Sequence, residues 1–154
     1  MTNLDTLLAI EAIKKTKATY WYALDTKQWD LLGTTFTRDG IADYQGAVDF
    51  SHRPDEESAR LAAEAGDPVV IKGRGQIVQW FETRCGSWKT IHHGHAPIID
   101  ITGPETGKAI WPIFDYIDDG TSAGKGYGHY YDTYRQEDGE WRLDYLCFVR
   151  MHRE

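Results

Sequence analysis

GYGHYYDTYRQEDGEWRLDYL, residues 126–146, joins two runs of strand-forming residues through the turn residues Glu137-Asp138-Gly139. Aromatic and β-branched residues favour extended backbone, and Asp-Gly favours a tight reversal of the chain. The pattern predicts an antiparallel hairpin with strands over Gly126–Gln136 and Trp141–His152.

Two more strand-forming runs precede this hairpin, at Lys89–Ile101 and Lys108–Ile117. The connections are TGPETG at 102–107 and DDGTSAG at 118–124, and both consist of residues that favour turns. Four long strands joined by short turns predict a β-meander in the second half of the chain.

The chain before the meander is predicted to be largely helical. Ile10, Ile13, Tyr20 and Leu24 recur at helical spacing, and Lys17 interrupts this apolar stripe. The spacing predicts one long helix at the N-terminus.

Thr2 or Asn3 is expected to cap the start of that helix, which should end near Asp25–Lys27. A short helix over 28–33 is expected next, and a second core helix begins near Gly73.

Between these helices, Asp39-Gly40 predicts the turn of a short hairpin with strands at Phe36–Arg38 and Ile41–Tyr44. Residues 49–68 are polar and rich in Ala and Glu, which indicates an extra surface helix or a lid.

Helices followed by a meander predict an α+β fold, since a parallel α/β sheet would alternate the two kinds of element. Long antiparallel strands that twist strongly can curl around the N-terminal helices and leave a hollow. We therefore expect a single domain over 1–154, a cone-shaped α+β barrel with a mainly antiparallel sheet.

Composition excludes several functions. The net charge of −7 and the scattered Lys and Arg residues argue against nucleic acid and against an anionic membrane surface. The N-terminus lacks the pattern of a signal peptide and no run is apolar enough to span a bilayer, so a cytoplasmic protein with two reduced cysteines is expected. Aromatic residues make up 13%, which favours a ligand cavity.

Asp25 is a candidate catalytic residue at the end of the first helix. The negative end of the helix dipole and partial burial would both raise its pKa, which suits a general acid or base. The alternative is a solvated Asp that ends the helix together with Thr26.

TIHHGHAPIID, residues 90–100, contains three of the six histidines, His92, His93 and His95. On a strand His93 and His95 share one face, and a third ligand such as His129 would complete a zinc site. A metal-free acid–base histidine is the preferred interpretation, so no metal or cofactor is expected.

Tyr20 and Tyr44 could donate a hydrogen bond to a developing oxyanion, or could simply pack in the core. Asp115 lies in an apolar strand and could orient a histidine in the pocket or point outward. Trp21, Trp88, Asp115 and His129 are the candidates for substrate binding.

The first helix with Asp25, the helix GRGQIVQWF (73–81), the strand TIHHGHAPIIDI (90–101) and residues 126–146 together resemble a known family. They are similar to the nuclear transport factor-like superfamily, in its SnoaL-like branch of polyketide cyclases, scytalone dehydratase, bile acid dehydratase and hexachlorocyclohexane dehydrochlorinase. The resemblance covers the chain except the insertion around 49–68.

The resemblance implies a catalytic dyad in which His92 takes a proton from carbon and Asp25 holds and charges the imidazole. It places Tyr20 where the bile acid dehydratases have a Tyr, and Tyr44 where scytalone dehydratase has one. Tyr20 and Leu146 stand where the dehydrochlorinase has cations that handle chloride, and Ala96 stands where an Asn is common. Dehydrochlorination is therefore not expected.

The leading hypothesis is a cofactor-independent lyase, a dehydratase of a small hydrophobic cyclic hydroxy-ketone. An isomerase or cyclase with the same dyad is the alternative, and a non-catalytic binding or dimerisation module is the third. A homo-oligomer, dimer or trimer, is expected because Trp111, Phe114 and Tyr116 could form an apolar convex face.

Overall fold

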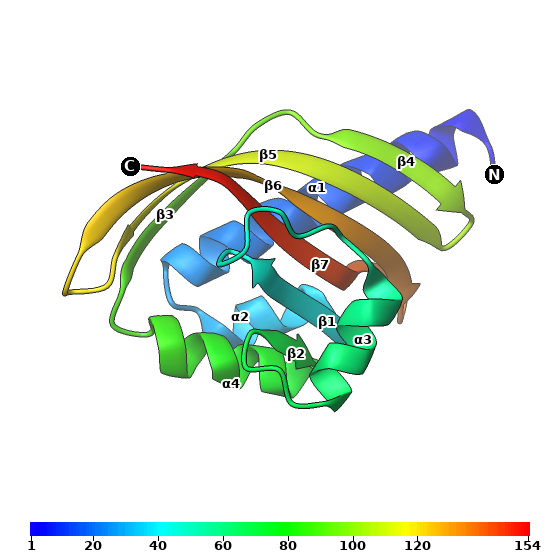
Figure 1. The fold of residues 1–154 in the computed structure, drawn as a ribbon. Coiled ribbons are helices and arrows are strands. Elements are labelled where there is room, and N and C mark those ends of the chain that lie inside the picture. Colours follow the sequence, from blue (N-terminus) through cyan, green and yellow to red (C-terminus); the bar gives the residue numbers. More distant parts are fainter.

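A strongly curved seven-stranded sheet wraps around one long helix in the computed structural model, which describes residues 1–154 (Figure 1). The elements are α1 (Asn3–Asp25), α2 (Trp29–Thr34), β1 (Phe36–Gly46), α3 (Glu56–Glu64), β2 (Val70–Lys72), α4 (Arg74–Cys85), β3 (Lys89–Gly94), β4 (Ile98–Gly103), β5 (Thr106–Asp118), β6 (Ala123–Glu137) and β7 (Glu140–Arg153).

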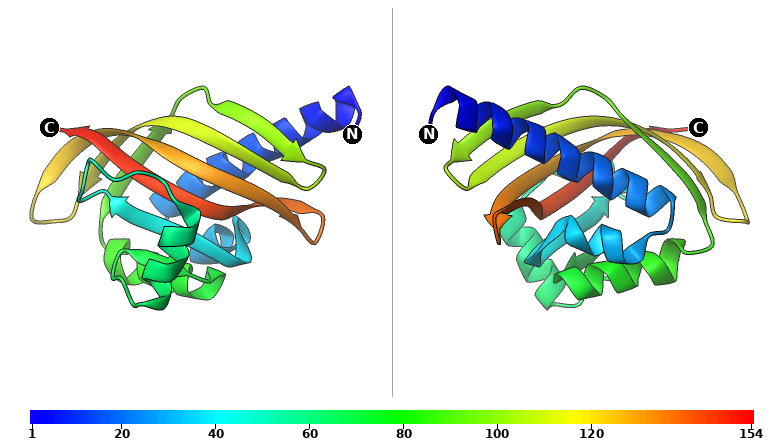
Figure 2. Two further views of the ribbon diagram at one scale, coloured as in Figure 1. Left: turned by 45° about the vertical axis from the view of Figure 1, so that its right-hand side comes forward. Right: turned by 180° about the vertical axis from the view of Figure 1, so that it is seen from behind.

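The α+β prediction is confirmed. The strand order is β2-β1-β7-β6-β5-β3, and β4 also pairs with β5. Every pair is antiparallel except β1–β7, which is parallel. Helix α1 crosses the concave face of the sheet, while α2 and α4 lie below it (Figure 2).

The hairpin at 126–152 forms as predicted. Glu137 pairs with Glu140, and the two residues between them have positive φ, 55° at Asp138 and 78° at Gly139. A two-residue turn of this hand matches the right-handed twist of the flanking strands.

Helix α1 also starts and ends where the sequence indicates. The Thr2 side chain accepts a hydrogen bond from the backbone N–H of Asp5, whose carboxylate accepts from Thr2 in return. The helix ends at Asp25, with Thr26 as its C-cap.

The hairpin predicted around Asp39-Gly40 is wrong, because residues 36–46 form the single strand β1. Gly40 does not adopt the positive φ that a tight hairpin turn of this kind requires. The pairing of β1 with β7 shifts register between Phe36 and Ile41, so Asp-Gly marks an irregularity within one strand.

The single strand predicted over 89–101 is divided at residues 95–97. Pro97 has no N–H to donate to a ladder, and the N–H of His95 donates to the carbonyl of Pro112 at 2.9 Å. Both halves, β3 and β4, pair with β5. The short strand β2 was not expected from the sequence.

Side chains alternate between the two faces of β5 and β6. Trp111 is 4% exposed and donates its indole N–H to the Tyr134 hydroxyl, so it belongs to the core and the prediction that it lies on the convex face is wrong. Phe114 is half-buried on the opposite face, where its ring lies 5.3 Å from that of Tyr127.

Lys17 is fully buried and faces Asp132, with Nζ 2.8 Å from Oδ2 and neither side chain exposed. Its ammonium also lies 3.6 Å from the centre of the Tyr130 ring. Burial lowers the pKa of Lys17 to about 8, an effect that the Asp132 charge partly offsets. The residue that interrupts the apolar stripe of α1 is thus half of an ion pair that links α1 to β6.

We expect Lys17→Met to destabilise the fold by about 3–5 kcal/mol, because it leaves the buried Asp132 carboxylate without a cation. Chemical denaturation measures the loss. The double variant Lys17→Met/Asp132→Asn should recover part of it, and equal stabilities for the single variant and the native protein would contradict a paired charge.

No helix of the structure combines the length and the apolar character needed to cross a membrane.

Candidate active site

A cavity of about 310 Å³ opens between the C-terminal end of α1, α4 and the concave face of the sheet. Its wall is mainly apolar and aromatic, with one histidine, one carboxylate and three arginines. The lining residues are Leu24, Tyr44, Ala47, Val48, Phe50, Val69, Trp80, Phe81, Arg84, Cys85, Trp88, Thr90, His92, Asp115, Ile117, Tyr130, Phe148, Arg150 and Arg153.

Asp25 and His92 are in direct contact at this cavity. Oδ1 of Asp25 lies 2.6 Å from Nδ1 of His92, and Oδ2 accepts the backbone N–H of His92 at 2.8 Å. Thr90 donates its hydroxyl to Oδ1 at 2.8 Å. The Asp25 side chain is 22% exposed and the His92 side chain is 5% exposed, so the pair is largely shielded from water.

The local structure explains this contact. β3 lies at an edge of the sheet, where alternate backbone N–H groups have no strand partner. The N–H of His92 is one of these, and Asp25 at the end of α1 takes the place of the missing strand. His92 pairs with Asp115 of β5 in register, and both residues line the cavity.

The expected rise in the pKa of Asp25 is wrong. Burial does raise this pKa, but the hydrogen bonds and charge of His92 and the Thr90 hydroxyl together outweigh burial, and the pKa falls below its usual value. Asp25 is therefore ionised at neutral pH. It can hold and charge an imidazole, and it is a poor proton acceptor itself.

Asp25→Asn tests this ionisation through stability. A folded-state pKa below the unfolded value of about 3.9 means that the ionised Asp25 stabilises the fold above that value, and that this contribution is lost as the pH falls through the folded pKa. We expect the difference in unfolding free energy between native and variant proteins to be largest at neutral pH and to shrink below about pH 4.

Asp30→Asn is the matched control for that measurement, since Asp30 is exposed on α2 and its side chain makes no hydrogen bond. A pH-independent effect of Asp25→Asn would contradict the assignment.

Three tyrosines gather beside the dyad. The hydroxyl groups of Tyr20 and Tyr44 are in hydrogen-bond contact, and the ring of Tyr20 lies 6.1 Å from that of Tyr130. Burial raises the pKa of all three phenols well above the usual value, so they remain protonated and can donate hydrogen bonds. Tyr44 and Tyr130 line the cavity, and Tyr20 stands behind Tyr44.

Asp115 points inward and pairs with Arg150 rather than with a histidine. Nη1 of Arg150 lies 2.8 and 2.9 Å from the two carboxylate oxygens. Both side chains are nearly buried and both line the cavity.

Leu146 does not line the cavity, and a different residue of β7 brings a cation to it. Leu146 is fully buried in the core, and Arg150, four residues further along β7, brings a guanidinium into the cavity. Arg150 could be found in the sequence by the same signal as Asp115, because both are charged residues within an apolar strand.

Two predicted substrate-binding residues do not line the cavity. Trp21, on α1, packs against the sheet with its ring 5.6 Å from that of Trp111. A side chain at Gly94 would collide with the Trp21 ring. His129 lies on the outer face of β6, where Nδ1 contacts the sulfur of Met151. Successive side chains of β6 point to opposite faces of the sheet, and because Tyr130 points inward, His129 points outward.

Trp88 does line the cavity, as do several residues that no sequence pattern singled out. Trp80 stacks on Tyr44 with ring centres 5.5 Å apart. Cys85 also faces the cavity, and burial raises the pKa of its thiol to about 11. Trp80 and Cys85 both lie on α4, and no other sequence feature links them.

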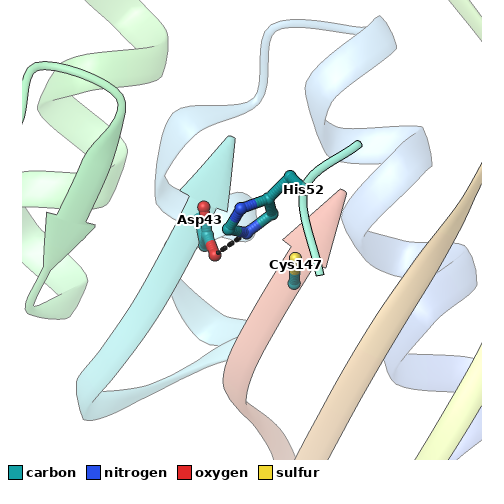
Figure 3. Close-up of side chains that lie close together, drawn as sticks. All are labelled: Asp43, His52 and Cys147. Atoms are coloured by element: carbon teal, nitrogen blue, oxygen red, sulfur yellow. Dashed lines mark hydrogen bonds and ion pairs between the residues drawn. The ribbon is translucent and has the colours of Figure 1, made fainter. Parts of the chain in front are cut away.

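The histidines that were weighed as an alternative zinc site do not face the cavity. His93 and His95 are exposed and neither lines the cavity. Asp43, His52 and Cys147 do converge, within 4.8 Å of one another on the outer side of β1 and β7 (Figure 3).

Hydrogen-bond donors already occupy the Asp43 carboxylate in this cluster. Nε2 of His52 lies 2.9 Å from Oδ2, the Tyr145 hydroxyl donates to the same oxygen at 3.1 Å, and the backbone N–H of Gln45 donates to Oδ1 at 3.0 Å. Burial raises the pKa of the Cys147 thiol, which disfavours a thiolate ligand. The cluster thus anchors the segment 47–55, which supplies Ala47, Val48 and Phe50 to the cavity wall.

We expect His52→Ala to cost about 1–3 kcal/mol, because it removes a donor from a buried carboxylate. Hydrogen exchange within 47–55 should accelerate. Arg53→Ala is the control, since Arg53 bonds only to carbonyls of its own segment. Unchanged exchange in His52→Ala would show that the segment is held elsewhere.

Comparison with known proteins identifies the same fold. The model of the SnoaL-like domain family matches residues 5–146. A relative named "Probable cyclase FGR4", from Gibberella zeae, is 23% identical over 148 residues, which cover 94% of this chain and 92% of that protein.

Solved structures of other proteins have the same fold as this chain. The "Putative Scytalone Dehydratase" of Novosphingobium aromaticivorans DSM 12444 superposes with a TM-score of 0.77 at 19% identity, covering 99% of this chain and 91% of that chain. Hexachlorocyclohexane dehydrochlorinase LinA type 2 gives 0.79 at 15% identity, covering 99% and 92%. Identities this low establish the fold alone.

Proposed function

Since this chain belongs to the SnoaL-like domain family, we propose that it is a cofactor-independent enzyme that removes a proton from carbon, most simply a dehydratase of a small cyclic hydroxy-ketone. The observation that carries the proposal is the Asp25–His92 contact at an aromatic cavity. A non-catalytic module would not require an ionised carboxylate behind a shielded imidazole.

The contact defines the roles of both groups. The ionised Asp25 accepts the Nδ1–H of His92, which leaves the lone pair of a neutral imidazole on Nε2. Nε2 makes no hydrogen bond within the chain, so it is available as the base. When it takes a proton, the carboxylate 2.6 Å from Nδ1 stabilises the imidazolium.

The tyrosines supply the second half of the reaction. As His92 breaks a C–H bond next to a carbonyl, negative charge develops on the carbonyl oxygen, and the protonated hydroxyl of Tyr44 or Tyr130 can donate to it. The enolate then expels a hydroxyl group from the neighbouring carbon as a C=C bond forms. A proton from His92 or a tyrosine converts the leaving hydroxide into water.

An isomerase or cyclase would use the same first step. In an isomerisation the proton taken by His92 returns to another carbon and no water is lost, whereas in a cyclisation the enolate carbon attacks a second carbonyl. The cyclase name of the Gibberella zeae relative favours keeping this alternative. Halide elimination is not part of the proposal, since Tyr20 stands where the dehydrochlorinase has a Lys and Arg150 is paired with Asp115.

Proton exchange tests the shared step before the natural substrate is known. In heavy water we expect bicyclic ketones such as 3-hydroxy-1-tetralone to exchange the hydrogen next to the carbonyl, measured by NMR. Dehydration of that ketone gives 1-naphthol, so the same sample separates loss of water from simple exchange.

His92→Gln should lower the exchange rate by at least about 100-fold, because a general base contributes about 10²–10⁴. Tyr22→Phe, on the exposed side of α1, is the control. Full exchange activity in a folded His92→Gln protein would refute the dyad as the catalytic group.

We also propose a homo-oligomer. Ile91, Phe114 and Tyr127 leave apolar surface on the outer face of β3, β5 and β6, which a second copy could cover. Light scattering of the purified protein decides between monomer, dimer and trimer.

A further inference from the structure

The cavity carries a charge opposite to that of the protein. The chain has a net charge of −7, yet three arginines line the cavity, at 84, 150 and 153, against the single carboxylate of Asp115. A smaller hollow of about 270 Å³ shares these four residues and adds Lys125 and Asp119. We call this part the vestibule.

Two of these arginines have no hydrogen-bond or ion-pair partner within the chain. The chain contains nine arginines, and seven of them donate at least one hydrogen bond to a carboxylate or carbonyl, at positions 38, 53, 60, 74, 135, 142 and 150. The guanidinium groups of Arg84 and Arg153 donate none, and both line the cavity. Their free N–H groups are therefore available to a ligand in the cavity.

Arg84 is held by the aromatic wall. Its Cζ lies 5.3 Å from the ring centre of Trp80 and 5.9 Å from that of Trp88, and both rings line the cavity. Such contacts orient a planar guanidinium while its N–H edge remains free to bind an oxyanion.

Arg153 reaches the vestibule from the end of β7, beside the glycines of β6. A side chain on Gly124 would approach Nε of Arg153 to 3.3 Å, and one on Gly126 would collide with Arg150 and Asp115. The end of β7 and the connection from α4 to β3 lie on the same side of the molecule (Figures 1 and 2). Elements far apart in the sequence therefore bring the two arginines to one opening.

We infer that the substrate carries an oxyanion group, a carboxylate or a phosphate, which Arg84 and Arg153 bind in the vestibule while the ring of the substrate occupies the aromatic part of the cavity. The inference rests on the proposed function, since it takes this cavity to be the substrate site. Guanidinium groups bind both oxyanions through paired hydrogen bonds.

Calorimetric titration with ligands of one ring system tests the inference. The probes are 2-naphthoate, its neutral isostere 2-naphthamide, and 2-naphthyl phosphate, which distinguishes the two oxyanions. We expect an oxyanion to bind the native protein at least about tenfold more tightly than the amide, and this preference to weaken in about 1 M salt.

The double variant Arg84→Gln/Arg153→Gln should lose the preference while it still binds the amide. Arg53→Gln/Arg60→Gln is the matched control, because it removes the same charge from the segment before α3 and from α3 itself. Equal affinities for the three probes in the native protein, or an unchanged preference in Arg84→Gln/Arg153→Gln, would overturn the inference.

His92→Gln separates this inference from the proposed function. The variant should keep the oxyanion preference while it loses proton exchange. A different result would be that Arg84→Gln/Arg153→Gln loses the preference for oxyanion probes and yet keeps full exchange activity and an unchanged Michaelis constant for anionic ketones. That result would place substrate binding elsewhere and would overturn the inference alone.

Discussion

The carboxylate of Asp25 is the point at which helix and sheet are joined. It accepts three hydrogen bonds from β3, donated by the Thr90 hydroxyl and by the backbone N–H and Nδ1 of His92. These bonds satisfy an edge strand that would otherwise present free N–H groups, and they fix the end of α1 against the sheet. They also set the tautomer and position of the imidazole, so one interaction closes the cone and arranges its chemistry.

The interior of the cone is polar at intervals along α1, and each polar group has a partner on the sheet. Lys17 pairs with Asp132, Tyr20 reaches Tyr44, and Asp25 reaches His92. Lys17 and Tyr20 are three residues apart and share a helix face, whereas Asp25 reaches β3 from the last residue of the helix. Along α1 towards Asp25, these contacts run from the closed ion pair of Lys17 to the imidazole of His92, whose Nε2 has no hydrogen bond within the chain.

Much of the fold follows from local sequence. The extent of α1, the strand character of 106–118 and the hairpin at 126–152 were predictable, because capping residues, periodicity and turn residues act over a few positions. Asp39-Gly40 misled for the same reason: a local turn signal cannot show that β1 continues as a partner of β7, more than a hundred residues away. Asp25 and His92 were predicted together only through resemblance to a family, since 67 residues separate them.

The sequence by itself determined the elements and the kinds of chemical group that the chain contains, because helix and strand preferences are properties of neighbouring residues. Only the tertiary structure decided which groups meet. The alternation of β6 turned His129 outward and Tyr130 inward. The pairing of β7 with β6 shifts register between Arg150 and His152, and both Arg150 and Arg153 line the cavity. The hydrogen bonds from β3 lowered the pKa of Asp25, where helix position alone would raise it. Burial and pairing depend on contacts between distant segments, and those exist only once the sheet has closed around α1.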